Sequence, residues 1–220
     1  MSPAGDTQRP QGQPVITLPS PAELDDLAVL TGRAKRLDAE GAMRLQCADG
    51  HLATWVCVVQ GAGVLGDGTV LGLRVARASA TAPVDTVVPL AAVTDRLAAR
   101  GADTTDFSVP PSEVRAGWAS ISPPRGGWEP VARIDEGDLA AVARAGIEEV
   151  TAGAPEGSGA AAVADLRRRV WATGVGVGWP RGLAFGAHAL GFLGDGPEAV
   201  LWRVGPWWRL STERGHVLAR

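Results

Sequence analysis

The chain has 220 residues, of which 45% are apolar and 20% are charged, and its formal net charge is −3. This composition is ordinary for a globular protein with one or two domains. The small negative charge gives no electrostatic reason to expect a nucleic-acid or acidic-membrane partner. No segment has the roughly 20 consecutive apolar residues that a membrane-spanning helix needs.

The N-terminal segment is rich in Gly, Pro, Gln and Ser, and it predicts a disordered tail over residues 1–16. It has no apolar stretch, so no secretory signal peptide is expected. Pro19 and Pro21 then precede a predicted short helix at residues 22–30. The acidic start of that helix is favoured by the helix dipole.

An Asp-Gly pair at residues 49–50 separates two β-patterned runs, 43–48 and 51–59, and predicts a β-hairpin. In its register the side chains of Cys47 and Cys57 point to opposite faces and lie too far apart for a disulfide. We therefore expect two buried, reduced thiols in a cytoplasmic protein.

The second strand of this hairpin is apolar on both faces. Leu52 and Val56 share a face with the apolar residues of the first strand. Trp55 and Val59 lie on the other face, with Arg44 opposite Trp55. Because both faces are apolar, another part of the protein has to cover each of them.

Further strands are predicted at residues 69–77 and 84–88, followed by a helix at 89–100 with apolar residues at helical spacing. Residues 114–122, which include Trp118, are predicted to form another strand.

Residues 123–130 contain two prolines and two glycines, and they predict a linker between an α+β half, 17–122, and a second half, 131–220. Arg125 and Trp128 flank the glycines. Two interpretations remain open. The segment is an interdomain hinge with Trp128 packed into the second half, or it is a loop that faces a ligand or partner.

The second half is predicted to begin with a helix capped by Asp135, followed by a helix capped by Ser158. A third helix at 180–193 is apolar on nearly all sides and has small residues at Gly182 and Gly186. Such a helix is typically buried.

The chain closes with β-patterned runs at 199–204, 207–212 and 216–219, the first two joined by a Gly-Pro turn. In this hairpin a tryptophan lies opposite an arginine on each face, a pairing that contributes on the order of 0.5–1 kcal/mol. Together with the linker, the hairpin supplies a candidate interaction surface: Trp202, Arg203, Trp207, Trp208, Arg209, Arg125 and Trp128.

No complete catalytic, cofactor or metal signature is found in the sequence. The G-x-G-x-x-G pattern at 61–66 leads into a strand instead of the helix that a dinucleotide site requires, so it predicts a hairpin loop. His51, His188 and His216 are not at the short spacings of metal sites. We therefore predict no cofactor, no metal ion and no assignable catalytic residue. A catalytic group assembled from distant residues stays open.

Four segments together resemble an uncharacterised family of short proteins from high-GC Gram-positive bacteria. They are Leu-Pro-Ser-Pro at 18–21, residues 122–129, Ala-His-Ala-Leu-Gly-Phe-Leu at 187–193, and residues 210–220. The similarity extends over most of residues 15–220. That family has no assigned activity, cofactor or catalytic residue, so the resemblance implies only a cytoplasmic bacterial protein.

As a whole, the sequence predicts an α+β fold. A β-hairpin-rich N-terminal half with two helices would pack against a C-terminal half of three helices closed by a small antiparallel sheet. We expect a non-catalytic interaction or scaffold protein that self-associates or binds a protein partner. Its contact surface would be the terminal tryptophan–arginine sheet or the second face of the Trp55 strand.

Two alternatives remain. The first is a nucleic-acid-binding regulator with a winged-helix-like C-terminal half, although its third helix lacks a polar base-reading face. The second is a small-molecule binder or enzyme with a cleft between the two halves, near Arg125 and Trp128.

Overall fold

A computed structural model of the chain describes residues 12–63, 66–155, 157, 159–194 and 196–220. Residues 1–11 of the predicted tail lie outside these ranges. The end of that tail differs from the prediction, because Val15 and Ile16 belong to a strand and Ile16 is fully buried.

The helices lie in both halves of the chain and, among the described residues, none is long and apolar enough to cross a membrane. They are α1 (Pro21–Leu37), α2 (Leu90–Ala98), the 3-10 helix η1 (Gly117–Ser120), α3 (Glu136–Gly153), α4 (Ala160–Ala172) and α5 (Gly182–Leu190).

The strands form one large sheet and two small ones. Those of the large sheet, here the main sheet, are β2 (Ala42–Ala48), β3 (His51–Val59), β4 (Val70–Arg77), β6 (Val84–Pro89), β8 (Glu129–Asp135), β11 (Glu198–Val204), β12 (Trp207–Ser211) and β13 (His216–Ala219). The small sheets contain β1 (Val15–Thr17) with β5 (Ser79–Ala80) and β7 (Asp106–Ser108), and β9 (Gly174–Val175) with β10 (Trp179–Pro180).

The main sheet joins the two halves of the chain. Its strand order is β6-β2-β3-β4-β13-β12-β11-β8, and its neighbouring strands are antiparallel. In the N-terminal half, β2, β3 and β4 form a meander with β6 outside it. In the C-terminal half, β11, β12 and β13 form a meander with β8 outside it. The halves meet where β4 pairs with β13. The α+β class is confirmed. The predicted separate sheet of the C-terminal half is wrong, because its strands continue the N-terminal sheet.

Both predicted hairpins are present in the predicted register. In the first, Arg44 lies opposite Trp55. In the second, Trp202 lies opposite Arg209, and Arg203 opposite Trp208. The second hairpin has β8 on one side and β13 on the other. It is therefore not the free wing that a winged-helix domain would need.

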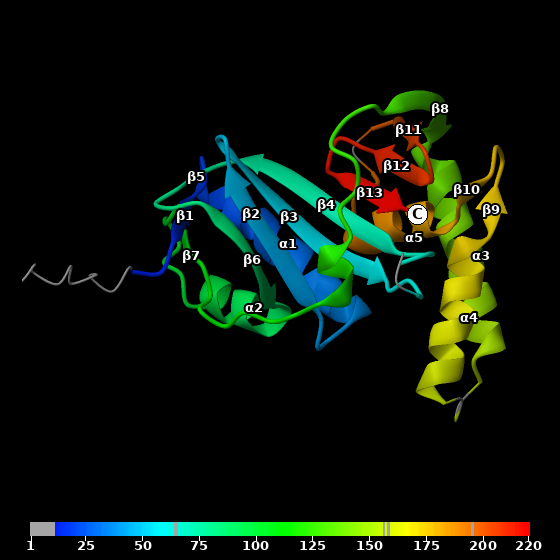
Figure 1. Ribbon diagram of the computed structural model, residues 1–220, viewed down its shortest axis with the longest axis horizontal. Helices are drawn as coiled ribbons and strands as arrows, with labels where there is room; N and C mark the ends of the chain where they lie inside the picture. Colours follow the sequence, from blue (N-terminus) through cyan, green and yellow to red (C-terminus); the bar gives the residue numbers. More distant parts are fainter. Residues whose placement is uncertain (1–11, 64–65, 156, 158, 195) are drawn as a thin grey trace, which may run out of the picture.

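α1 and α5 cover one face of the main sheet (Figure 1). This helix face carries the side chains of Met43, Leu45, Val56, Leu201, Leu210 and Val217, each at most 1% exposed. α5 packs against it at the junction of β4 and β13, and the prediction that this helix is buried is confirmed. A Cβ at Gly186 would lie 2.7 Å from the Val217 side chain, so glycine permits this close approach.

The predicted helix starts are confirmed in part. The Asp135 side chain caps α3 by accepting hydrogen bonds from the backbone N–H groups of Gly137 and Asp138. Ser158, the predicted cap of the next helix, lies outside the described residues, and Gly159 is at the N-cap position of α4.

Two predicted elements near the middle of the chain are wrong. Residues 114–122 do not form a strand, and the buried Trp118 lies instead in η1. Glu129 and Pro130, which were predicted to end the linker, belong to β8. Apolar and polar residues alternate over 114–122 as they would in a strand, but no strand of the main sheet pairs with this segment among the described residues.

Candidate functional site

The face of the main sheet opposite the helices is crossed by residues 109–128, here called the connector, which run from β7 to β8 (Figure 1). A cavity of about 340 Å³ lies between the connector and this open face. Its lining residues are Arg44, Gln46, Trp55, Leu71, Leu73, Val75, Trp118, Ala119, Ile121, Ser122, Pro123, Pro124, Arg125, Trp128, Arg209, His216 and Leu218.

Strand alternation explains why these side chains meet. Successive residues of a strand point to opposite faces, so residues two apart share a face. On β4 this brings Leu71, Leu73 and Val75 to the open face. Trp55 of β3 and His216 of β13 both lie opposite Leu73, one on each side of it. The floor of the pocket therefore crosses the junction between the two halves.

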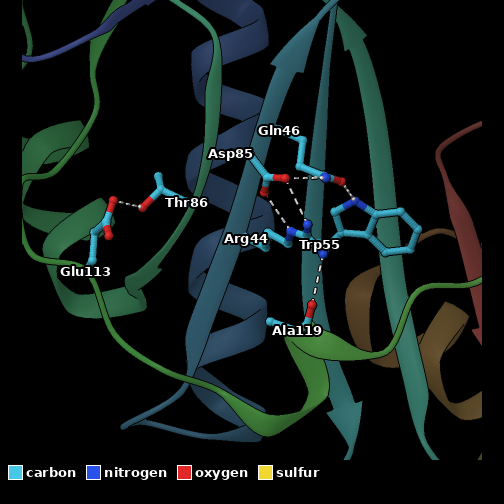
Figure 2. A network of polar contacts seen from close by, with 7 residues as sticks. All are labelled: Arg44, Gln46, Trp55, Asp85, Thr86, Glu113 and Ala119. Atoms are coloured by element: carbon cyan, nitrogen blue, oxygen red, sulfur yellow. Dashed lines mark hydrogen bonds and ion pairs between the residues drawn. The ribbon is translucent and has the colours of Figure 1, made fainter.

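A polar network holds the connector to the sheet (Figure 2). The Arg44 guanidinium donates two hydrogen bonds to the Asp85 carboxylate, of 2.8 and 2.9 Å, and a third of 2.9 Å to the carbonyl oxygen of Ala119 in the connector. Gln46 also donates to Asp85, and the Trp55 indole donates to Gln46. The hydrogen bond from Arg44 is the main reason why the pKa of Asp85 lies below its usual value.

Other contacts fix the connector at its start. The backbone N–H of Val114 donates to the carbonyl of Val87 over 2.9 Å, and the Thr86 hydroxyl donates to Glu113 over 2.8 Å (Figure 2). Beside η1 the connector also borders a second and wider hollow, of about 760 Å³, which it shares with Cys57 at the end of β3. The connector is thus pinned at separate points and leaves space between them.

At the end of the connector, one arginine stacks on two indole rings. The Arg209 guanidinium is 4.7 Å from the ring centroid of Trp128 and 5.0 Å from that of Trp202. Its Nε atom is buried and has no hydrogen-bond partner in the described chain. Burial lowers the pKa of Arg209 from its usual value. The arginine nevertheless stays charged, since an arginine pKa lies far above neutral pH.

The charges around the pocket are unbalanced. Among its described lining residues are three arginines and a histidine, and no carboxylate. Arg44 is neutralised by Asp85, whereas neither Arg125 nor Arg209 forms an ion pair within the described chain. His216 contributes little charge at neutral pH, because burial and the nearby Arg209 both lower its pKa.

The candidate residues from the sequence separate into two groups. Arg125, Trp128 and Arg209 line the pocket, and Trp202 stacks on Arg209 beside it. Arg203 and Trp208 form a second stacked pair, at 4.9 Å, on the opposite face of the sheet. The rings of Trp207 and Trp208 are only 5% and 8% exposed. Whether these residues form an interaction surface stays a prediction.

Sequence reasoning missed other parts of the pocket. The sequence placed Arg44 opposite Trp55 but did not predict its contact with the connector. It also did not predict that Leu218 and His216 lie beside β4. The available signal was the strand at residues 51–59, whose apolar second face requires a cover. Nothing in the sequence identified that cover as the connector.

The other sequence motifs do not add to the site. The G-x-G-x-x-G segment joins β3 to β4, and Ala62 pairs with Asp67 through two backbone hydrogen bonds. Val64 and Leu65 lie outside the described residues. Within the described residues, no three His, Cys, Asp or Glu side chains gather in a way that could hold a metal ion.

Comparison with protein families divides the chain at the connector. Residues 12–120 match the family described as Domain of unknown function (DUF8010), and residues 123–220 match the family described as Domain of unknown function (DUF8185). No curated protein matches the chain.

Solved structures similar to this chain are DNA polymerase sliding clamps. They include a DNA polymerase III beta subunit of Eubacterium rectale (TM-score 0.58, 9% identity), the sliding clamp of Caulobacter crescentus (0.56, 11%) and the DNA polymerase III beta subunit of Thermotoga maritima (0.50, 12%). In the same order, the matches cover 95%, 95% and 94% of this chain. The chain spans 65%, 65% and 64% of the length of those proteins. The chain thus matches two domains of unknown function, and the fold that they build together is like that of a sliding clamp.

Proposed function

We propose that this protein is a non-catalytic scaffold that binds a short segment of a partner protein in the pocket between the connector and the open face. The single observation that carries this proposal is the cavity of about 340 Å³, which has an apolar floor and aromatic walls. Its volume lies at the lower end of the range of ligand pockets, about 300–1,000 Å³. A few side chains of a partner therefore suit it better than a folded surface.

The lining of the pocket supports a protein ligand. Leu71, Leu73 and Leu218 form the apolar floor, and Trp55 and Trp128 stand beside it. Burial of one large apolar side chain contributes about 1.5–3 kcal/mol, and tryptophan and arginine are frequent anchors of protein interfaces. One or two apolar side chains of a partner thus provide enough free energy for a reversible complex.

The similar structures support a binding role. They are described as sliding clamps of a DNA polymerase, and one of them has polyethylene glycol bound in a region proposed to tether the beta motif. At sequence identities of 9–13% the likeness concerns the fold alone. It agrees with a scaffold that is built on a continuous sheet.

The test is to fill the pocket. Peptides that bind the full chain would be selected from a random phage-displayed library, synthesised, and measured by isothermal titration calorimetry. Leu73→Trp places a bulky side chain in the pocket without changing charge, and we expect it to weaken binding at least about tenfold. The matched control is Val29→Trp on α1, since Val29 is 53% exposed on the helix side of the protein.

A measurement on the unmodified protein guards against a variant that fails to fold. A peptide held beneath the connector should slow proteolysis within residues 109–128. If no peptide is selected, or if bound peptides neither protect the connector nor respond to Leu73→Trp, the proposal is wrong.

Nucleic-acid binding is a second candidate, since the similar structures are described as subunits of a DNA polymerase. The net charge of −3 argues against it. Retention on double-stranded DNA at low ionic strength, with loss at higher salt, would support this candidate. No retention at low salt would remove it.

Self-association is a separate proposal. The main sheet ends in β6 and β8, and no described strand pairs with the outer edge of either. Such edges are where another chain can add a strand. Sedimentation velocity at several protein concentrations would test it, and a single monomeric species throughout would contradict it.

A cytoplasmic location is also proposed. It is supported by Cys47 and Cys57, which are both free thiols in the structure. Fractionation of cells that express the tagged full chain would test it.

A further inference from the structure

Arg209 is a half-buried charge with no ion-pair partner in the described chain. Its guanidinium stacks on Trp128 and on Trp202, and its Nε atom is enclosed without a hydrogen bond. Each ring compensates part of the lost hydration through a cation–π contact. Neither ring replaces the hydrogen bonds to water, so the enclosed Nε donor remains unsatisfied.

Two neighbouring arginines, Arg44 and Arg203, differ from Arg209 in their hydrogen bonds. Arg44, at the same pocket, is satisfied by Asp85 and by the Ala119 carbonyl. Arg203 stacks on one ring, is exposed, and donates from Nε to the carbonyl of Gly205. Of the two arginines that stack on tryptophan, Arg209 is the one without a protein acceptor, and it lines the cavity.

The stacking also fixes how an anion can approach. The ring centroids of Trp128 and Trp202 lie 4.7 and 5.0 Å from the Arg209 guanidinium, so the two rings limit the directions from which a further partner can approach it. Because Nε is buried, the two terminal nitrogens are the donors that remain. Two parallel N–H groups in one plane match the two oxygens of a carboxylate.

We infer that the pocket selects partner segments with an acidic side chain beside an apolar anchor, and that Arg209 binds this carboxylate through its terminal N–H groups. The inference rests on the proposed function and names the chemistry of its ligand. The charge of the site agrees, since no carboxylate is present among the described lining residues and Arg125 lies exposed at the rim. The rings that hold Arg209 in place reduce the entropy lost on binding.

The first experiment keeps the protein unchanged. Among the phage-selected peptides we expect Asp or Glu next to large apolar residues. Each acidic residue of a synthesised peptide is then replaced by its amide, Asp by Asn and Glu by Gln. One of these changes should weaken binding by roughly tenfold to a hundredfold, as is typical for loss of a charge-assisted hydrogen bond.

The second experiment assigns the effect to Arg209. Arg209→Met keeps an apolar chain against the rings and removes the charge. It should weaken binding of the acidic peptide as much as the amide change does, and it should leave binding of the amide peptide unaltered. The matched control, Arg203→Met, removes the stacked arginine of the opposite face and should change neither affinity.

The outcomes are distinct. Peptides that bind beneath the connector but show no preference for an acid, or whose preference survives Arg209→Met, overturn this inference and leave the proposed function standing. Failure of every peptide to bind removes both. If Arg209→Met does not fold, the amide substitutions in the peptide still decide whether a carboxylate is recognised.

Discussion

The two faces of the main sheet are covered in different ways. The helix face is packed by α1 and α5, and its side chains, such as Leu45 and Leu201, are fully buried. Among the described residues, the connector is what crosses the open face; it is attached by hydrogen bonds from a few residues and leaves a cavity. Dense packing on the first face stabilises the fold, and incomplete packing on the second leaves apolar and cationic groups available to a ligand.

The two faces should differ most in how far a leucine-to-alanine substitution lowers the free energy of unfolding. Leu45→Ala on the helix face should lower the free energy of unfolding by about 2–5 kcal/mol, because it leaves a cavity in a dense core. Leu73→Ala on the open face should cost about 1 kcal/mol or less, since Leu73 already borders a cavity. Urea unfolding followed by tryptophan fluorescence measures both. Equal losses would show that the open face is packed as tightly as the helix face.

The two cysteines, one on each face, should differ in how they become reactive. Burial raises the pKa of the Cys57 thiol to about 12, with Asp38 as a second cause, and burial also raises the pKa of Cys47. A thiol with a pKa of about 12 reacts at pH 8 roughly a thousandfold more slowly than an unfolded thiol with a pKa of about 8.5. Both thiols of the native protein should therefore be nearly inert to Ellman's reagent.

Low concentrations of urea should then separate the two thiols. Cys57 borders the hollow beside η1, so release of the connector exposes it, whereas Cys47 requires unfolding of the helix face. Mass spectrometry of alkylated peptides would follow each thiol. Modification of Cys47 before Cys57 would contradict the view that the connector is the weaker cover.

Acid should loosen the connector selectively. The pKa of Asp85 is lowered in the folded protein, so its contribution to stability is present above the unfolded value of about 3.9 and is lost as pH falls through the folded value. Since the Asp85 side chain is 55% exposed, this contribution should be below about 1 kcal/mol. The unfolding free energies of the wild type and of Asp85→Asn should differ at pH 7, and the difference should shrink as the pH falls below about 3.9. A difference that does not shrink in acid would exclude the Arg44 pair as its cause.

The smallest effect on stability concerns the two arginines that stack on tryptophan, Arg203 and Arg209. Arg203→Met should lower the free energy of unfolding by about 0.5 kcal/mol, because an exposed cation–π contact is lost. Arg209→Met should be neutral or slightly stabilising, because the lost ring contacts are offset by removal of an unsatisfied charge. Differential scanning calorimetry on both variants would decide. A loss of more than about 1 kcal/mol for Arg209→Met would show that Arg209 serves the fold.

Local signals in the sequence predicted much of the secondary structure. The Asp-Gly turn and the Gly-Pro turn predicted both hairpins and their registers, because a two-residue loop leaves little freedom in pairing. Asp135 predicted the start of α3, and the apolar residues of α5 predicted its burial. Each of these features depends on residues close together in the chain.

The connector shows where local signals failed. Its residues 114–122 alternate as a strand would, yet they have no strand partner among the described residues. Their conformation depends on Arg44 and Val87, which lie far away in the sequence and bind Ala119 and Val114. The predicted tryptophan–arginine surface also differs from the arrangement in the structure. Hairpin register paired Trp202 with Arg209, but the position of Trp128 beside them came from the course of the connector.

By itself, the sequence determined the α+β class, the hairpins, the buried helix and the need for a cover over Trp55. These follow from turn chemistry and from the spacing of apolar residues, which act over a few positions. The tertiary structure alone decided that β4 pairs with β13, that the connector is the missing cover, and that Arg209 stacks on two rings beside a cavity. Such contacts join residues far apart in the chain, and their free energy depends on packing and desolvation, which no local pattern records.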